Sequence, residues 1–308
     1  FKRLLAANDM DGAVALARSQ EDDGAHALDL CVATTGRDEA RDMAELGGRL
    51  NRISRLPLFV DSTSPDVMAA TLRHITGRPV LNSMNLENPA RAREILALAR
   101  DHGAAVVALT IDEQGMALTA KRKVAVCTRI LDLARTEFGL GPDDILFDLL
   151  TLAIGAGKGQ FRNAAAETLL GLRELKRILP ESLTILGISN ISYGLPIPVR
   201  EILNGVFLQE ALDAGLDAAI MDTGTRAKTG KAGEDADATR WARDLVYNRQ
   251  ADGDSDPLTA LLERFKMCES PVAKTHSVPV TVADRLQRKI LDGDRGQVTV
   301  LVDAALVN

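Results

Sequence analysis

Several features that define specialised classes of protein are missing from this sequence of 308 residues. It has no run of about 18 apolar residues, the length that a membrane-spanning helix requires, and its first residues show no signal-peptide pattern. Only 3% of the residues are aromatic and the net charge is −6, which is unfavourable for a general nucleic-acid binder. We therefore expect neither a membrane nor a nucleic acid among the partners of this chain.

Cysteine is scarce as well. Cys31, Cys127 and Cys268 are odd in number and far apart, which is typical of a reducing compartment and predicts a cytoplasmic protein. A zinc site would require close pairs such as C-x-x-C, and none is present, so we expect no metal in this chain. The three thiols are expected to be small, buried or half-buried side chains.

The sequence also lacks an initiator methionine, and a helical pattern is already under way at Phe1 and continues to Ser19. From this we expect a fragment of a longer polypeptide. What is present is ordinary for a soluble globular chain: 46% hydrophobic and 26% charged residues. The length is sufficient to bury a large core.

Short apolar runs alternate with longer stretches of helical period up to about residue 224. This alternation predicts a parallel sheet covered by helices, and the nearly continuous apolar character of the runs indicates strands buried on both faces. The predicted strands span residues 25–32, 56–60, 79–81, 104–111, 145–147, 183–188 and 218–221, and the predicted helices span 38–52, 65–75, 89–102, 119–138, 164–179 and 198–214.

A carboxylate or carboxamide stands at or near the end of every predicted strand. In an α/β barrel the carboxyl ends of the strands meet on one face, where active sites lie. Such residues also start turns, so each one alone has an ordinary explanation. Together they offer acceptors and amides but almost no positive charge, which suits a neutral, donor-rich heterocycle better than a phosphate. The seven residues are Asp29, Asp61, Asn82, Asp112, Asp148, Asn190 and Asp222.

Seven strands are one fewer than an α/β barrel of the (β/α)8 (TIM) type requires, so we expect the first strand upstream of residue 1. After residue 224 the pattern changes to a loop at 223–235 and helices at 236–249 and 258–267. We therefore predict a barrel over residues 1–267 and a linker over 268–280. Residues 281–308 are predicted to form an αα-hairpin at the start of a further helical domain.

The strand-end motifs, taken together, resemble the folate-binding (pterin-binding) module of cobalamin-dependent methionine synthases. The same barrel is found in methyltetrahydrofolate:corrinoid protein methyltransferases and, more distantly, in dihydropteroate synthases. The resemblance covers nearly all of residues 1–250, and residues 281–308 resemble the first helices of the cap on the cobalamin-binding domain. The motifs are Phe1-Lys2-Arg3-Leu4, Val60-Asp61-Ser62, Leu81-Asn82-Ser83, Asp112-Glu113-Gln114-Gly115, Phe147-Asp148 and Gly187-Ile188-Ser189-Asn190-Ile191-Ser192.

This resemblance implies a methyltransferase that moves the methyl group of 5-methyltetrahydrofolate to cob(I)alamin. The cobalamin would be bound by a separate domain of the same polypeptide. Asn190 and Asp148 would be catalytic, and Asn190 would reach the N5 region of the pterin. For Asp112 a direct contact and a loop-anchoring role are equally open. The folate-binding residues implied are Asp61, Asn82, Asp112, Asp148, Ser189 and Asn190.

Some residues depart from the family pattern. Cys31 stands where Asn is frequent, Leu149 follows Asp148 where Pro is frequent, and residues 157–160 replace an acidic stretch. Outside the motifs, we interpret Asp29 as structural and Asp222 as turn-forming. Three basic residues at 226, 228 and 231 are interpreted as part of a solvated loop, with contact to a polyglutamate tail as the alternative.

Three other functions are consistent with parts of the pattern. A dihydropteroate synthase would need basic or backbone donors for a pyrophosphate leaving group, whereas Asp and Asn dominate the predicted mouth. A pterin-binding module without catalytic activity would bind folate and transfer nothing. A further methyltransferase would keep the corrinoid partner and use another methyl donor.

Overall fold

The computed structural model describes residues 1–154, 161–223, 235–249 and 256–266, which belong to one compact unit, Phe1–Lys266. Seven strands form a single parallel sheet in the order β1-β2-β3-β4-β7-β8-β9. This confirms the α/β barrel class and all seven predicted strands. Their bounds are β1 (Leu28–Leu30), β2 (Leu58–Asp61), β3 (Val80–Met84), β4 (Ala105–Leu109), β7 (Ile145–Asp148), β8 (Leu183–Gly187) and β9 (Ala218–Ile220).

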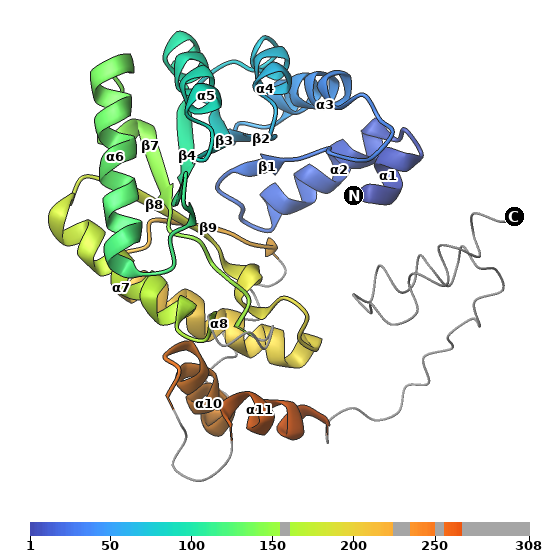
Figure 1. The fold of residues 1–308 in the computed structure, drawn as a ribbon. Coiled ribbons are helices and arrows are strands. Elements are labelled where there is room, and N and C mark those ends of the chain that lie inside the picture. Colours follow the sequence, from blue (N-terminus) through green and yellow to red (C-terminus); the bar gives the residue numbers. More distant parts are fainter. Residues whose placement is uncertain (155–160, 224–234, 250–255, 267–308) are drawn as a thin grey trace, which may run out of the picture. The chain divides into compact units, whose positions relative to one another are not determined.

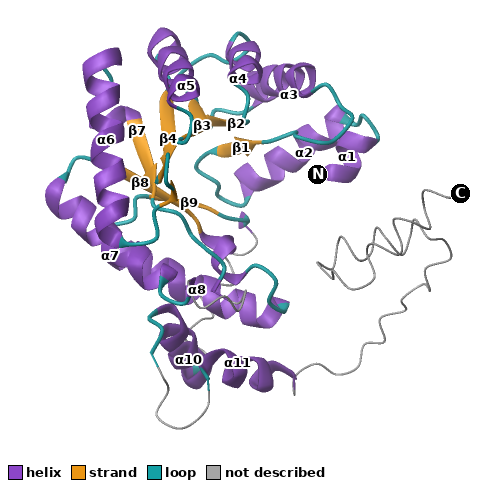
Figure 2. Ribbon diagram, in the orientation of Figure 1, coloured by secondary structure: helices purple, strands orange, loops and turns teal. Residues whose placement is uncertain are grey.

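Helices cover the outside of this sheet, as Figure 1 shows for α3 to α8, and the strands lie at the centre (Figure 2). No helix in the described ranges is long and apolar enough to cross a membrane. The helices are α1 (Lys2–Ala6), α2 (Met10–Asp22), α3 (Glu39–Ile53), α4 (Pro65–Leu72), α5 (Pro89–His102), α6 (Ala120–Phe138), α7 (Ala164–Ile178), α8 (Ile197–Asp213), α10 (Ala236–Val246) and α11 (Pro257–Lys266).

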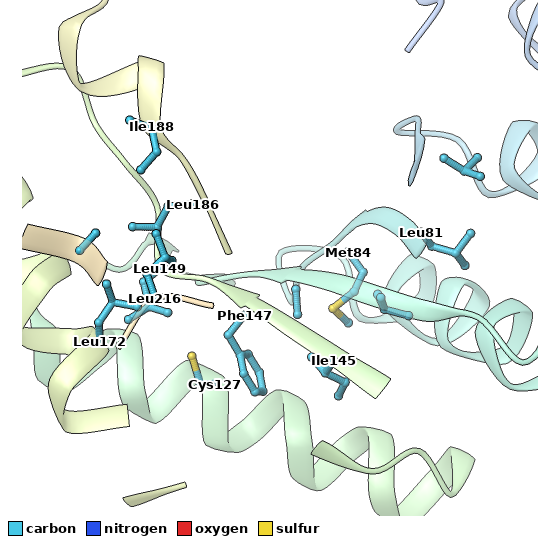
Figure 3. Close-up of a cluster of buried hydrophobic side chains, with 14 of the residues drawn as sticks. Leu81, Met84, Cys127, Ile145, Phe147, Leu149, Leu172, Leu186, Ile188 and Leu216 are labelled. Atoms are coloured by element: carbon cyan, nitrogen blue, oxygen red, sulfur yellow. The ribbon is translucent and has the colours of Figure 1, made fainter. Parts of the chain in front are cut away.

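Side chains alternate between two cores along each strand, because successive residues of a strand point to opposite faces. One face points to the barrel interior, where Phe59, Val80, Val107 and Ile185 form a small apolar cluster. The other face packs on the helices and forms the large core. Figure 3 shows part of this outer core, with Phe147 directed from β7 toward α6.

The helix ends follow from local chemistry. Asn88 caps α5 by accepting hydrogen bonds from the backbone N–H groups of Ala90 and Arg91, and Pro89 occupies the first turn. The helix stops at Gly103, whose φ of 62° is a left-handed conformation that glycine adopts without strain. These signals explain why the predicted helix 89–102 has the bounds that the structure shows.

Two sequence-based expectations were wrong in detail. The helical pattern of residues 1–19 is two helices, because the chain turns at Asn8 (φ 54°) and Asp9 caps α2 by accepting from Gly12 N. The predicted strand 104–111 ends at Leu109. Residues Ile111–Asp112 (β5) instead pair with Gly115–Met116 (β6) in a separate antiparallel hairpin. The predicted linker 268–280 and hairpin 281–308 lie outside the described residues.

We predict that Leu172 and Leu170, two residues apart on α7, contribute very differently to stability. Leu172 is fully buried in the outer core, whereas Leu170 is 46% exposed. Leu172→Ala should lower the free energy of unfolding by about 2–5 kcal/mol, because it leaves a cavity. Leu170→Ala should change it by less than about 0.5 kcal/mol. Urea unfolding followed by circular dichroism measures both, and equal losses would contradict the described packing of α7.

Candidate ligand site at the barrel mouth

A cavity of about 430 Å³ lies at the carboxyl ends of the strands. Residues from β1 and from β9, the two edges of the sheet, both line it, so the sheet curls around a common interior. Five of the six residues that the sequence predicts to bind a ligand are among the lining residues. The lining comprises Asp29, Asp61, Asn82, Asp148, Gly187, Ser189, Asn190, Ile220, Met221 and Asp222.

The strand alternation explains why polar groups gather here. Asp61 lies two residues after Phe59, and Asn82 two residues after Val80, so each shares the interior face with an apolar residue. On β7, Asp148 lies in the same way above Leu146. Of the residues of this interior cluster only Ile220 is among the described lining residues, and the other strand ends contribute carboxylates and carboxamides.

Asp29, Asp61 and Asn82 form one side of the cavity. Asn82 Nδ2 donates a hydrogen bond to Asp29 Oδ1 at 3.3 Å. Burial and the charge of Asp61 raise the pKa of Asp29 to about 6, while the Asn82 hydrogen bond lowers it. Burial also raises the pKa of Asp61, and the Cys31 thiol, which donates to Asp61, opposes this rise. Two crowded carboxylates thus share a region that favours their neutral forms.

Asp148 faces this pair from the end of β7. Its Oδ1 accepts a hydrogen bond from Leu150 N at 2.7 Å, which fixes the carboxylate relative to its own backbone. Burial raises the pKa of Asp148 to about 6, and the Leu150 hydrogen bond and the charge of Lys123 counteract that rise. At neutral pH the carboxylate is therefore mainly ionised and can accept hydrogen bonds from a ligand.

Asn190 lies at the rim, in a short 3-10 helix (Ile188–Ser192) that follows β8. Its side chain is exposed, and its amide lies over Gly187: a Cβ at Gly187 would be only 2.8 Å from Asn190 Nδ2. Ser192 Oγ donates to the Ser189 carbonyl at 3.2 Å and thereby stabilises the turn. A glycine at 187 is what allows the Asn190 amide to occupy this position.

Asp112, the sixth predicted ligand-binding residue, does not line the cavity. It is a buried residue of the β5–β6 hairpin itself, and it forms ion pairs with Arg122 and, at 3.3 Å, with Arg129. It also accepts a hydrogen bond from Gln114 N at 3.0 Å. These contacts fit the loop-anchoring role, and a direct contact with a ligand stays a prediction.

Asp29 and Asp222 both line the cavity, although the sequence pattern favours a structural role for Asp29 and a turn-forming role for Asp222. The structural interpretation of Asp29 rests on the apolar character of its strand. Leu28 and Leu30 on either side pack into the outer core, however, so alternation turns Asp29 inward. That two-residue period is the signal that could have identified it. Asp222 follows Ile220 by two residues in the same way.

The residues that depart from the family pattern, and the cysteines, differ in how deeply they are buried. Cys31 is exposed, contrary to expectation, whereas Cys127 is buried as expected. Leu149 is fully buried in the outer core and directed away from the cavity. Residues 157–160, the basic residues at 226, 228 and 231, and the third cysteine at 268 lie outside the described residues.

The cavity lining is rich in hydrogen-bond acceptors and poor in cationic groups. None of its described lining residues is Lys, Arg or His, and its polar groups are four carboxylates, two carboxamides and one hydroxyl. Such a lining matches an uncharged heterocycle whose ring N–H and amino groups donate hydrogen bonds. No group of three His, Cys, Asp or Glu side chains in the described part of the chain is arranged to hold a metal ion.

Comparison with curated proteins finds methionine synthases. The enzyme of Mycobacterium leprae (strain TN) is 40% identical over 99% of this chain, and that of Mycobacterium tuberculosis (strain ATCC 25618 / H37Rv) is 38% identical over the same share. In both cases the match spans 26% of the relative, so the chain corresponds to about a quarter of the length of those proteins.

Comparison with solved structures finds dihydropteroate synthases. The enzyme of Coxiella burnetii in complex with pteroic acid has a TM-score of 0.52 and 16% identity, over 73% of this chain and 86% of its own. That of Stenotrophomonas maltophilia has a TM-score of 0.54 and 19% identity, over 73% and 87%. At such identities the likeness concerns the fold alone.

The sequence profile described as "Pterin binding enzyme" matches residues 1–222, well over half of the chain. The matched range contains every described residue that lines the cavity. With this match and the polar cavity at the strand ends, the chain belongs to the pterin-binding enzyme family.

Proposed function

We propose that this chain binds 5-methyltetrahydrofolate in the barrel-mouth cavity and transfers its N5 methyl group to cob(I)alamin carried by a separate domain of the same polypeptide. The observation that carries the proposal is the combination of an acceptor-rich cavity with an exposed amide, Asn190, at its rim. The identity of 38–40% to methionine synthases over 99% of the chain supports it.

Asp61, Asn82 and Asp148 are the residues that would hold the pterin ring. A pterin presents ring N–H and amino groups on one edge, and ionised carboxylates are strong acceptors for such donors. Asn82 donates to Asp29, which orients its amide and leaves its carbonyl oxygen available to the ligand. Ile220 and Met221, the apolar side chains of the lining, would contact the ring plane.

Methyl transfer from a tertiary amine requires help at the nitrogen. The C–N5 bond breaks with its electron pair remaining on N5, so a proton or a strong hydrogen bond must neutralise the developing charge. The Asn190 amide can donate such a hydrogen bond from the rim. The carboxylates would then orient the ring and stabilise positive character on it, while Gly187 allows the amide to lie close.

The acceptor must approach from outside the barrel. Cob(I)alamin supplies a strong nucleophile that accepts the methyl group, and it is too large to enter a cavity of about 430 Å³. The rim position and exposure of Asn190 fit this requirement, because the methyl group would lie beside it at the opening. The chain itself would mainly bind, orient and polarise the donor.

The similarity of this fold to the folds of dihydropteroate synthases favours the alternative that the chain is such a synthase. A diphosphate leaving group needs basic side chains or converging backbone donors, and no described lining residue is basic. An inactive pterin-binding module would share the cavity, and a related methyltransferase would use another donor. All three alternatives predict no methyl transfer from the folate.

Anaerobic methyl transfer is the direct test. The chain is mixed with 5-methyltetrahydrofolate and free cob(I)alamin, and methylcobalamin formation is followed by its visible spectrum. A rate clearly above the protein-free control supports the proposal. Tight folate binding without transfer indicates a binding-only module. A matched incubation with a pterin diphosphate and an arylamine acceptor, followed by diphosphate release, tests the synthase alternative. Absence of both folate binding and transfer would refute the proposal.

We predict that Asn190→Ala slows methyl transfer much more than it weakens binding. Loss of the hydrogen bond to N5 should lower the rate about 100-fold. The dissociation constant of the folate should change by no more than about threefold, since the other contacts remain. Gly187→Ala should displace the amide through its new Cβ and lower the rate about tenfold. A loss confined to affinity would assign Asn190 a plain binding role.

Asp148→Asn should weaken folate binding about 10- to 100-fold, because a charge-assisted hydrogen bond to the ring is replaced by a weaker one. The variant keeps an oxygen that can accept from Leu150 N, so the local backbone should be retained. Isothermal titration calorimetry measures the affinity. Asp143→Asn, an exposed residue just before β7, is the matched control and should bind as the unmodified chain does. Unaltered affinity in Asp148→Asn would remove Asp148 from the site.

The raised pKa values predict opposite effects of pH on binding and on stability. Asp29 and Asp148 have pKa values of about 6, above their ordinary 3.8, so folding favours their protonated forms. Their contribution to stability is therefore present below pH 4 and is lost as the pH rises through 6. Ring binding needs the ionised Asp148 carboxylate, so affinity should fall as the pH is lowered through 6.

Calorimetric affinity and thermal unfolding, measured in the same buffers between pH 4 and 8, check both trends. In Asp29→Asn, thermal stability should depend less on pH over this range, because the contribution from Asp29 titration is removed. A folate affinity that is constant between pH 5 and 7 would contradict the binding role of Asp148.

A further inference from the structure

Lys123, on α6, is a charged group that the proposed chemistry does not use. It is 1% exposed, less than any other charged residue in the part of the chain that the structure describes. Lysine is almost never fully buried without a partner, because removing an ammonium group from water costs several kcal/mol. We therefore expect the buried Lys123 ammonium group to have a specific hydrogen-bonding or charged partner.

The partner of the ammonium group lies directly behind the cavity. Lys123 Nζ donates a hydrogen bond to the Leu149 carbonyl, the residue that follows Asp148. The ionisable groups around it are Asp148 from β7, Glu167 from α7 and Cys127 from α6 itself. Burial lowers the pKa of Lys123 to about 8, and the charges of Asp148 and Glu167 counteract this, so the ammonium form is retained at neutral pH.

The turn after β7 links Lys123 to the Asp148 carboxylate. Leu150 has a left-handed backbone (φ 64°), and its N–H donates to Asp148 Oδ1 at 2.7 Å. Its carbonyl accepts a hydrogen bond from Thr168 Oγ1 at 2.8 Å. The turn is thus fixed from α6 by Lys123 and from α7 by Thr168, and an uncommon backbone conformation persists when its surroundings determine it.

The neighbouring helix leaves space for this arrangement. A Cβ at Gly171 on α7 would lie 3.0 Å from Leu149 Cδ2 and 3.4 Å from Lys123 Cδ. Glu167, one turn earlier, accepts a hydrogen bond from Ala120 N at 2.6 Å and so joins α7 to the start of α6. The lysine stem is therefore enclosed on the α7 side, and its charged end is directed to the Asp148 turn.

We propose that Lys123 is a positioning residue, which holds Asp148 ionised and oriented into the cavity and so sets the pH range over which the site binds its ligand. The ammonium charge favours the carboxylate form, while burial opposes it. From the cavity side, Asp29, Asp61 and Asp222 are the other acidic groups in the lining, and no described lining residue supplies a compensating cation. The consequence for ligand binding rests on the proposed function; the coupling to Asp148 does not.

The coupling is tested by carbon-13 NMR of the ligand-free chain with labelled aspartate carboxyl groups. The Asp148 resonance is identified by its absence in Asp148→Asn. In Lys123→Met, which keeps an unbranched stem and removes the charge, the titration midpoint of Asp148 should rise by about one pH unit. In Lys123→Gln, which keeps a donor but no charge, it should rise as well. Lys121→Met, exposed on the same helix, should leave it unchanged.

Two results would overturn the proposal: an unchanged Asp148 midpoint in both folded Lys123 variants, or an equal shift in Lys121→Met. If the Lys123 variants do not fold, labelled lysine in the Asp148→Asn variant provides the reciprocal measurement. The pKa of Lys123 should then fall below about 8, because an attractive charge is removed, and no fall would overturn the proposal.

Folate affinity measured against pH separates this proposal from the proposed function. If Asp148 titrates as expected and 5-methyltetrahydrofolate binds, the acid limb of the affinity profile should move upward in Lys123→Met by the same amount as the Asp148 midpoint. An affinity profile that does not move would overturn the role in binding. If the NMR shifts occur but no folate binds, the proposed function fails, and the coupling between Lys123 and Asp148 stands.

Discussion

The two-residue alternation of side chains along parallel strands is the constraint on which the site depends. Each strand must bury one face in the outer core and the other in a narrow interior, so the residue type at a strand end decides what the barrel mouth presents. Phe59 and Asp61 on β2, and Val80 and Asn82 on β3, illustrate this: apolar residues fill the interior, and polar residues appear where it opens. A one-residue shift of register would turn the carboxylates into the helix-facing core.

This arrangement divides the cavity into a recessed part and a rim. Asp61, Asn82 and Asp148 are half-buried or buried, so hydrogen bonds made there are little weakened by water. Asn190 is exposed and depends on a turn, on Gly187 and on Ser192 rather than on the sheet. The recessed polar groups thus come from the strands, and the amide nearest the opening comes from a turn beyond the end of β8.

Much of this could be predicted from the sequence, because strand and helix periods are local signals. Helix 89–102 has a cap at one end and a glycine at the other, and its bounds agree with the structure. The break at Asn8 leaves no clear signal in the sequence, because a single left-handed residue keeps the helical pattern almost intact. Asp112 could not be separated from the cavity residues, since its ion pairs with Arg122 and Arg129 come from a helix that follows a hairpin.

The electrostatic balance of the mouth could not be predicted at all, because it depends on groups that are distant in sequence. Lys123 precedes Asp148 by a whole helix and a strand, and in the sequence it is one of several basic residues on an amphipathic helix. Only the packing of α6 and α7 behind β7 brings its charge to the Asp148 turn. A site that gathers carboxylates to bind an uncharged ring destabilises its own ionised state. A cation hidden behind the lining offsets part of that cost without entering the cavity, where it would compete for the acceptors that the ligand needs.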